Sequence, residues 1–248
     1  MIEVVAADWP APPQIHAVQT TRRGGVSREP YDSLNLRSYT DDDSAAVQAN
    51  RQRLRDELRL PGEPLWLRQV HGTAVVDAAR CGAGEPVADA SDTTASNVVC
   101  AVLTADCLPV LMCADDGSWI GAAHAGWRGL AAGVLEALVA RAGLPPPRLM
   151  AWFGAAIGPA HFEVGPEVRE TFVRAQASAA LAFRAGRGDR WYADLYALAR
   201  LRLQQAGVQR IHGGGLCTYA DSARFYSYRR TPDTGRMATL IWRSALPD

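Results

Sequence analysis

The sequence predicts an α/β protein with a mixed sheet, in a single domain that spans residues 1–248. Short apolar runs bounded by turn residues recur along the chain, and they are interspersed with helical patterns in no regular order. Several hairpin signals accompany them, which indicates a mixed sheet and not a repeated βαβ series. No linker or internal repeat divides the chain, and 248 residues are enough to bury one substantial core.

The expected strands are the apolar runs bounded by turn residues, at 15–21, 66–70, 73–76, 98–103, 108–113, 118–123, 148–155 and 208–211. The expected helices have apolar residues at helical spacing, at 45–60, 130–142, 166–180 and 195–205. Three of these helices begin with a start signal. Acidic residues at 41–43 precede the first, Pro166 suits the first turn of the third, and Asp194 suits the N-cap of the last.

Charge and composition restrict the class of partner. The 26 basic residues balance 26 acidic ones and are scattered, so the chain lacks the electrostatic footprint of a nucleic-acid or anionic-membrane binder. Small molecules are therefore the expected partners, and no protein partner is implied. Every basic residue is arginine, so a bound phosphate must be held by arginine or by backbone N–H groups.

The first residues and the cysteines predict a cytoplasmic protein. The opening stretch MIEVVAADWP has an acidic lead and no long apolar core, unlike a secretory signal. The most apolar window, at 98–114, is shorter than the roughly 20 residues that a spanning helix needs. Five cysteines, an odd number, argue for reduced thiols and against a disulfide framework.

One predicted hairpin carries the main chemical signal. Two apolar runs flank the turn residues Asp115 to Gly117, with Cys107 before the first run and His124 at the end of the second. A turn centred on Asp116 and Gly117 pairs Cys107 with Gly126 and His124 with Pro109, whereas a turn centred one residue earlier pairs Cys107 directly with His124. Either register brings thiol and imidazole close enough to share a metal ion or to form a Cys-His dyad. His71, before Gly72 at a strand end, is the candidate third member.

Other candidates carry a functional and a plain structural interpretation. Asp106 adjoins Cys107 and is expected to orient His71 or His124, whereas the aspartates at 89 and 92 are expected to cap or solvate a loop. Arg128 lies at the start of a helix next to His124, where an anion would be stabilised; the alternative is that it only caps that helix.

Two further anion candidates are Arg51 on the first helix and the Gly24-Gly25 loop with its flanking arginines. A surface arginine and a solvated turn are the respective alternatives. The aromatic and cationic residues at 217–219 and 225–230 could wall a base-binding pocket, with core packing as the default.

The motifs QVHG, TADCLPV and HAGWRG together resemble the YfiH-type family, formerly described as laccase-domain or polyphenol oxidase proteins and since associated with purine nucleoside phosphorylase activity. TTRRGGVSREPYDSLNL, AAIGPAHFEVG, CTYADSARFYSYRR and TGRMATLIW resemble family blocks in the same order, so the resemblance covers nearly the whole chain. It implies a single-domain α/β/β/α sandwich with mixed sheets, similar to the cytotoxic necrotizing factor toxins. It also implies that His71, Cys107 and His124 hold the metal, and it places an arginine matching Arg51 near the active site.

Three ligands that leave a fourth position open are typical of catalytic zinc, which favours an enzyme. The resemblance implies phosphorolysis of adenosine, inosine and methylthioadenosine, with adenosine deamination as a side activity, on zinc or with copper in its place. The strongest alternative is a metal-free hydrolase or amidase of cell-wall precursors with Cys107 as nucleophile and His124 as base. Five histidines are too few for a multicopper oxidase. A zinc-stabilised binding module would need a fourth ligand.

Overall fold

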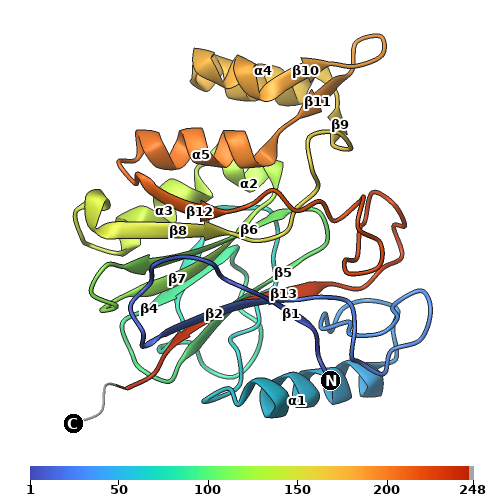
Figure 1. Cartoon of the computed structure of the whole chain (residues 1–248), viewed down its shortest axis with the longest axis vertical. Helices are drawn as coiled ribbons and strands as arrows, with labels where there is room; N and C mark the ends of the chain where they lie inside the picture. Colours follow the sequence, from blue (N-terminus) through green and yellow to red (C-terminus); the bar gives the residue numbers. More distant parts are fainter. Residues whose placement is uncertain (246–248) are drawn as a thin grey trace.

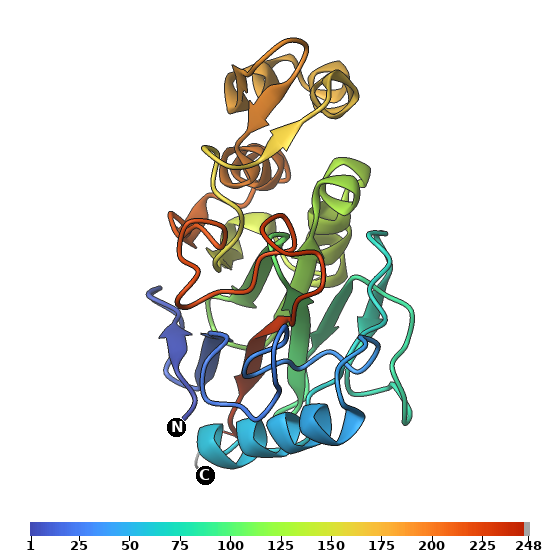
Figure 2. The same cartoon turned by 90° about the vertical axis from the view of Figure 1, so that its right-hand side faces the viewer.

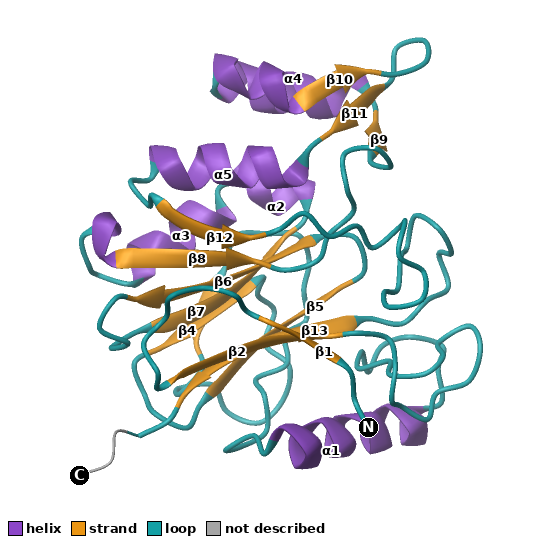
Figure 3. Cartoon of the chain, in the orientation of Figure 1, coloured by secondary structure: helices purple, strands orange, loops and turns teal. Residues whose placement is uncertain are grey.

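A computed structural model describes residues 1–245 as four stacked layers. Helix α1 (Ser44–Leu58) covers a four-stranded sheet, a six-stranded sheet packs on the other side of that sheet, and helices α3 (Val134–Arg141) and α5 (Leu195–Gln205) cover the outer face of the six strands (Figures 1 and 3). The predicted α/β/β/α sandwich with mixed sheets is confirmed.

The four-stranded sheet is antiparallel throughout and joins the two ends of the chain. Its order is β1 (Val4–Ala6), β2 (Ile15–Thr20), β13 (Met237–Arg243) and β5 (Val99–Thr104). The C-terminal strand β13 lies between the N-terminal strand β2 and the central strand β5. Residues that are more than 200 positions apart in the sequence are therefore neighbours in this layer.

The six-stranded sheet has antiparallel pairs at its centre and a parallel pair at each edge. Its order is β12 (Arg210–Gly213), β8 (Leu149–Phe153), β6 (Leu108–Ala114), β7 (Ile120–Ala125), β4 (Ala90–Thr93) and β3 (Val75–Asp77). The predicted hairpin from Cys107 to His124 supplies the central pair β6 and β7.

Both faces of this central hairpin are covered. Leu111 of β6 and Ile120 of β7 pack against the four-stranded sheet, whereas Val110 and Met112 face helices α3 and α5. A strand that is buried on both faces can be apolar at successive positions, which explains the continuous apolar run of β6.

Smaller elements complete the chain. Helix α4 (Pro166–Ala175) and a three-stranded sheet of β9 (Glu163–Val164), β10 (Phe183–Ala185) and β11 (Trp191–Ala193) lie at one end of the molecule, beyond α5 (Figure 2). The remaining elements are the short helix α2 and two 3₁₀ helices, at Trp127–Ala132, Pro146–Arg148 and Ala177–Ala182.

Several sequence predictions need correction. The helix expected at 166–180 ends at Ala175, because Gln176 is extended, and a 3₁₀ helix follows at Ala177–Ala182. The helix expected at 130–142 is two helices, α2 and α3, because Gly133 takes a φ of 102° that ends the first. The segment 66–70 is not a strand and makes only an isolated bridge, from Arg68 to Val87. The side-chain amide of Gln69 pairs instead with both backbone groups of Leu103, at 2.7 and 2.8 Å, in the manner of a strand neighbour.

Among residues 1–245, no helix combines the length and the apolar character that crossing a bilayer requires.

The core between the sheets makes a testable prediction. Leu111 is fully buried there, so Leu111→Ala should lower the free energy of unfolding by about 2–5 kcal/mol, through lost burial and the cavity left behind. Leu181→Ala is the matched control, because that side chain is 92% exposed and its loss should change stability by less than about 0.5 kcal/mol. Urea unfolding measures both, and equal losses would contradict the assignment of Leu111 to a packed core.

Candidate metal centre

Cys107 and His124 meet at the end of the central hairpin. The pairing of Leu108 with Ala125 and of Pro109 with His124 corresponds to a turn centred on Asp116 and Gly117, the first of the two predicted registers. Cys107 therefore lies opposite Gly126, immediately before the start of α2.

His71 completes the group from a loop that precedes β3. Its Nε2 lies 3.7 Å from the Cys107 Sγ, and its ring meets the His124 ring edge-on with centroids 4.8 Å apart. One ligand atom from each of the three side chains lies within 4.8 Å of the others. The His71 side chain is exposed and His124 is buried, so solvent reaches the group from the His71 side.

Two glycines of the HAGWRG motif allow this close approach. A Cβ atom on Gly126 would lie 2.7 Å from the His71 Cδ2 and 2.9 Å from the Cys107 Sγ. A Cβ atom on Gly129 would lie 2.9 Å from the Gly72 carbonyl oxygen. Real Cβ atoms do not approach other atoms so closely, so any side chain here would push the histidine loop away from the hairpin.

Asp89 holds two of the three candidate ligands. It does cap a loop, the one at 70–72, but the prediction that it lies in a solvated segment is wrong. Its carboxylate is fully buried, accepts a hydrogen bond from the His124 Nδ1 at 2.8 Å, and accepts the backbone N–H groups of Val70, His71 and Gly72 at 2.7–3.2 Å. A carboxylate only accepts, so His124 must carry a proton on Nδ1, and Nε2 is the nitrogen that it turns toward the group.

Asp106 does not perform the role predicted for it. Its carboxylate accepts hydrogen bonds from the hydroxyls of Thr218 and Ser227 at 2.6 and 3.0 Å and from the backbone N–H of Arg229 at 2.7 Å. These partners belong to the C-terminal loop, and no histidine is among them. Asp106, the residue before Cys107, therefore holds that loop next to the centre.

The buried polar groups form an ion pair. Burial favours the neutral thiol, but the adjacent His124 and His71 outweigh it and lower the pKa of Cys107 to about 6. Burial also favours the neutral imidazole, but the Cys107 thiolate and the Asp89 carboxylate raise the pKa of His124 to about 9. Burial raises the pKa of Asp89 as well, yet the hydrogen bonds from His124 and the loop N–H groups leave it lowered. Cys107 is therefore a thiolate near neutral pH.

The group opens into a cavity of about 520 Å³. Aromatic side chains and arginines line this metal cavity besides the three candidate ligands: Tyr39, Trp127, Phe162, Tyr228, Arg37, Arg128, Arg229 and Arg236. Of the expected wall at 225–230, Tyr228 and Arg229 do line it, whereas Phe225 and Tyr226 are core residues.

Of the predicted anion-binding residues, only Arg128 lines the cavity. Arg51 is buried elsewhere, where it donates to the Leu36 carbonyl, pairs with Glu85 at 3.0 Å and stacks on Trp66. The Gly24-Gly25 loop packs against other backbone, since a Cβ atom on Gly25 would lie 2.1 Å from the Ser33 carbonyl oxygen. The sequence prediction is therefore wrong for these three residues. Local motifs could not have indicated Arg37 and Arg236, which the fold brings from opposite ends of the chain.

The donor set fits one metal ion of the borderline class. Two imidazoles and a thiolate are the ligand types that zinc and copper accept, and the arrangement leaves a fourth position toward the cavity. Within residues 1–245 this is the one group of three or more histidine, cysteine or acidic side chains placed to hold an ion. His16 and His161 stack on Trp242 and Tyr219 instead. A multicopper cluster does not fit.

The fold and this site define an α/β sandwich protein with a His-Cys-His centre. Residues 16–244 match the sequence profile of the family described as multi-copper polyphenol oxidoreductase laccase, and the chain belongs to this family. Two relatives named purine nucleoside phosphorylase are closely similar. The one from Pseudomonas aeruginosa is 54% identical over 95% of this chain and 96% of its own, and YfiH from Escherichia coli is 49% identical over 98% and 99%.

Solved structures agree with this assignment. The crystal structure of the Neisseria meningitidis protein NMB0706 has a TM-score of 0.95 and 47% identity, and covers 98% of this chain and 99% of its own. YlmD from Geobacillus stearothermophilus has a TM-score of 0.90 and 30% identity, with 98% of each chain covered.

The hydrogen bond from His124 to Asp89 yields the first prediction for the site. Asp89→Asn removes the charge and turns an NH₂ group toward backbone donors, so the affinity for a probe ion such as cobalt(II) should fall about 10–100-fold. The light absorption of the cobalt-thiolate bond measures how much cobalt(II) is bound. Asp92→Asn, on strand β4 directly after Asp89, is the control, because Asp92 accepts hydrogen bonds from Trp119 and Arg141, away from the centre, and its change should leave cobalt affinity unchanged. Equal losses in both variants would show that the effect is general destabilisation.

The ion pair yields a prediction for pH. Between pH 7 and 9 the metal-free pair is thiolate with imidazolium, because the pKa of Cys107 is lowered to about 6 and that of His124 is raised to about 9. A metal ion must displace the His124 proton, so cobalt(II) affinity should rise about tenfold per pH unit over this window, with about one proton released per ion. Calorimetry in buffers of different ionisation enthalpy counts that proton. Affinity independent of pH would mean that His124 is already neutral.

Proposed function

We propose that this chain is a zinc-dependent purine nucleoside phosphorylase that acts on adenosine, inosine and S-methyl-5'-thioadenosine, with adenosine deamination as a side activity. The observation that carries the proposal is the cavity of about 520 Å³, in which a His-Cys-His group lies beside aromatic side chains and four arginines. Its size suits a small organic ligand, for which cavities of roughly 300–1,000 Å³ are usual. The names of relatives that are about half identical support the same reaction.

Each part of the cavity has a role in this proposal. The rings of Tyr39, Phe162 and Tyr228 offer faces on which a purine can stack. The cavity arginines would hold the phosphate beside the sugar carbon as the glycosidic bond loosens, which converts a bimolecular attack into one between neighbours. Asp89 keeps His124 oriented while the charge in the cavity changes.

His71, Cys107 and His124 would hold the ion. A bound zinc ion would supply a Lewis acid that stabilises charge developing on the substrate. The same three ligands also suit copper, which makes copper the alternative ion. Purine nucleosides and phosphate as partners, and a cytoplasmic location, complete the proposal.

One observation favours a second candidate, a metal-free hydrolase or amidase of cell-wall precursors. Cys107, His124 and Asp89 form a chain of thiolate, imidazolium and carboxylate, which is the arrangement of a cysteine nucleophile with its base and orienting acid. That chemistry needs only one imidazole at the thiol. A second imidazole, that of His71, lies 3.7 Å from the same sulfur, which supports the metal site over the hydrolase.

Product analysis tests the proposed reaction. Adenosine and inosine should yield free base and ribose 1-phosphate only when inorganic phosphate is present, because phosphate is the attacking group. Slow conversion of adenosine to inosine should persist without phosphate. Both activities should vanish together in His71→Ala, Cys107→Ala and His124→Ala, and chromatography of the products measures both.

The controls are a histidine and a cysteine outside the cavity. His16→Ala and Cys81→Ala should retain full activity, since His16 stacks on Trp242 and neither residue lines the cavity. Full activity after rigorous metal removal would contradict the zinc mechanism. Cleavage of an amide-containing cell-wall precursor, with no base released from any nucleoside, would establish the cysteine hydrolase instead.

A further inference from the structure

Arg37 and Arg236 share a wall of the metal cavity. Both line that cavity of about 520 Å³, and both also line an adjoining, more open hollow of about 460 Å³. Tyr39 belongs to both spaces as well and stacks beneath the Arg37 guanidinium, 4.3 Å from its ring centre. The two arginines therefore stand between the inner site and the outer surface.

Neither guanidinium is neutralised by the protein. Within the described part of the chain, neither Arg37 nor Arg236 has a carboxylate within ion-pair distance, and Nη1 of Arg236 donates only to the carbonyls of Thr234 and Gly235. Some other arginines of low exposure do have a carboxylate partner, for example Arg22 with Asp32, Arg51 with Glu85 and Arg202 with Glu136. Two adjacent cations without a partner form a site that an anion would stabilise.

The buried side chain of Asn35 keeps the backbones of Arg37 and Arg236 close together. The Oδ1 of Asn35 accepts the backbone N–H of Arg37 at 3.2 Å and that of Arg236 at 3.0 Å, which joins segments 201 residues apart. Asn35 is fully buried, and its Nδ2 donates to Thr40 and Asp42. The backbone N–H of Leu36 donates to the Arg236 carbonyl, a second link between the segments.

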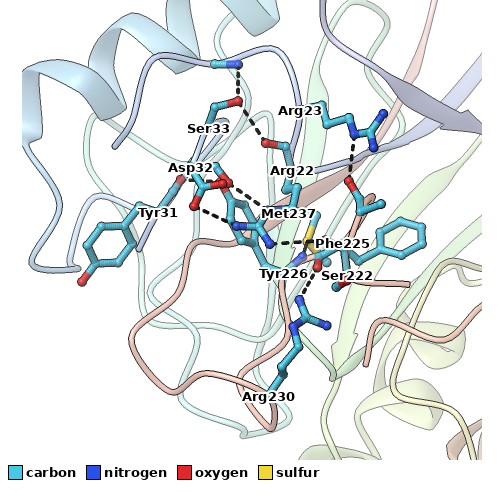
Figure 4. Close-up of polar contacts among 12 residues, drawn as sticks. Arg22, Arg23, Tyr31, Asp32, Ser33, Ser222, Phe225, Tyr226, Arg230 and Met237 are labelled. Carbon is cyan, nitrogen blue, oxygen red and sulfur yellow. Dashed lines mark hydrogen bonds and ion pairs between the residues drawn. The ribbon is translucent and has the colours of Figure 1, made fainter. Parts of the chain in front are cut away.

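A larger network holds the same two segments. Arg22 pairs with Asp32 within the N-terminal loop and also donates to the Ser222 carbonyl of the C-terminal loop, and the Tyr226 hydroxyl donates to the Tyr31 carbonyl (Figure 4). On the right of Figure 1 the blue and red loops accordingly lie side by side. These contacts hold the two loops together, so Arg37 and Arg236 stay close despite their mutual repulsion. Burial, and then Arg37, lower the pKa of Arg236.

We infer that Arg37 and Arg236 form the subsite that holds the phosphoryl group in the metal cavity. The outer hollow carries two carboxylates, Asp41 and Asp233, which would repel an anion. The inner cavity carries one, Asp106, whose oxygens already accept hydrogen bonds from two hydroxyls and a backbone N–H, so the group binds on the metal side of the two guanidiniums. The assignment of that anion as attacking inorganic phosphate rests on the proposed phosphorolysis. The anion-binding subsite itself is inferred from the two guanidinium charges, which no carboxylate within residues 1–245 pairs with.

The other cavity arginines fit this role less well. Arg229, like Arg236, donates Nη1 to a backbone carbonyl, but unlike Arg236 it is exposed, stacks on Phe162 and has the Asp106 carboxylate bound to its own backbone N–H. Arg128 is exposed, stands alone and stacks on Trp127. Helix α2, at whose start Arg128 lies, has only six residues, so its dipole adds little.

Direct binding of inorganic phosphate tests the subsite, apart from any activity. Calorimetry should detect phosphate binding to the wild-type chain, with affinity lowered about tenfold or more in Arg37→Met and in Arg236→Met, since each loses a charged fork. Arg37→Lys should recover part of the affinity. Arg187→Met is the control, because Arg187 is exposed and outside the cavity, and it should bind phosphate like the wild type. Unchanged cobalt(II) binding in every variant verifies that the fold is intact.

Several outcomes decide the matter. Unchanged phosphate affinity in Arg37→Met and Arg236→Met, or a loss confined to Arg128→Met, would overturn the subsite while leaving phosphorolysis standing. Arginine-dependent phosphate binding without phosphorolysis would sustain the subsite and refute the proposed function. Adenosine 5'-monophosphate is the second probe. Competition with phosphate supports the same subsite, whereas binding of the nucleotide without any binding of phosphate refutes it.

Discussion

The geometry of the centre depends on one buried carboxylate. Asp89 accepts three consecutive backbone N–H groups at 70–72 and the Nδ1 proton of His124, and it contributes its own carbonyl to the His124 N–H. A buried charge of this kind is tolerated only when its acceptor sites are filled. The interaction thus sets the position of the His71 loop and the tautomer of His124 together, and a change at Asp89 disturbs both ligands.

The layers explain why this site can be rigid and still open. Cys107 and His124 lie on the central hairpin, whose strands are buried on both faces. Their backbones therefore cannot shift independently. His71 comes from an exposed loop, and Gly126 and Gly129 let that loop lie directly against the start of α2. Cys107 and His124 are thus fixed by the hairpin, whereas His71 comes from the surface. The group therefore faces solvent although two of its members cannot move independently.

The cavity is closed by loops that meet only because the chain ends are paired in one sheet. Strand β13 lies between β2 and β5, and this brings the segment before β13 against the segment after β2. Arg37 and Arg236 face one cavity as a result. Asp106 adds a link, because it binds the C-terminal loop through Thr218, Ser227 and Arg229 and is itself the neighbour of Cys107.

The sequence by itself determined the features that depend on nearby residues. These include the hairpin that joins Cys107 to His124, though not which of its two registers forms, the helix that begins after Asp194, and the choice of two histidines and a thiol, because turn chemistry, capping and ligand type act over a few residues. Only the tertiary structure decided that Asp89 and not Asp106 holds His124, that Arg51 is paired in the core, and that Arg37 meets Arg236. Each of these depends on contacts between distant segments. Burial and strand order create those contacts, and no local pattern encodes them.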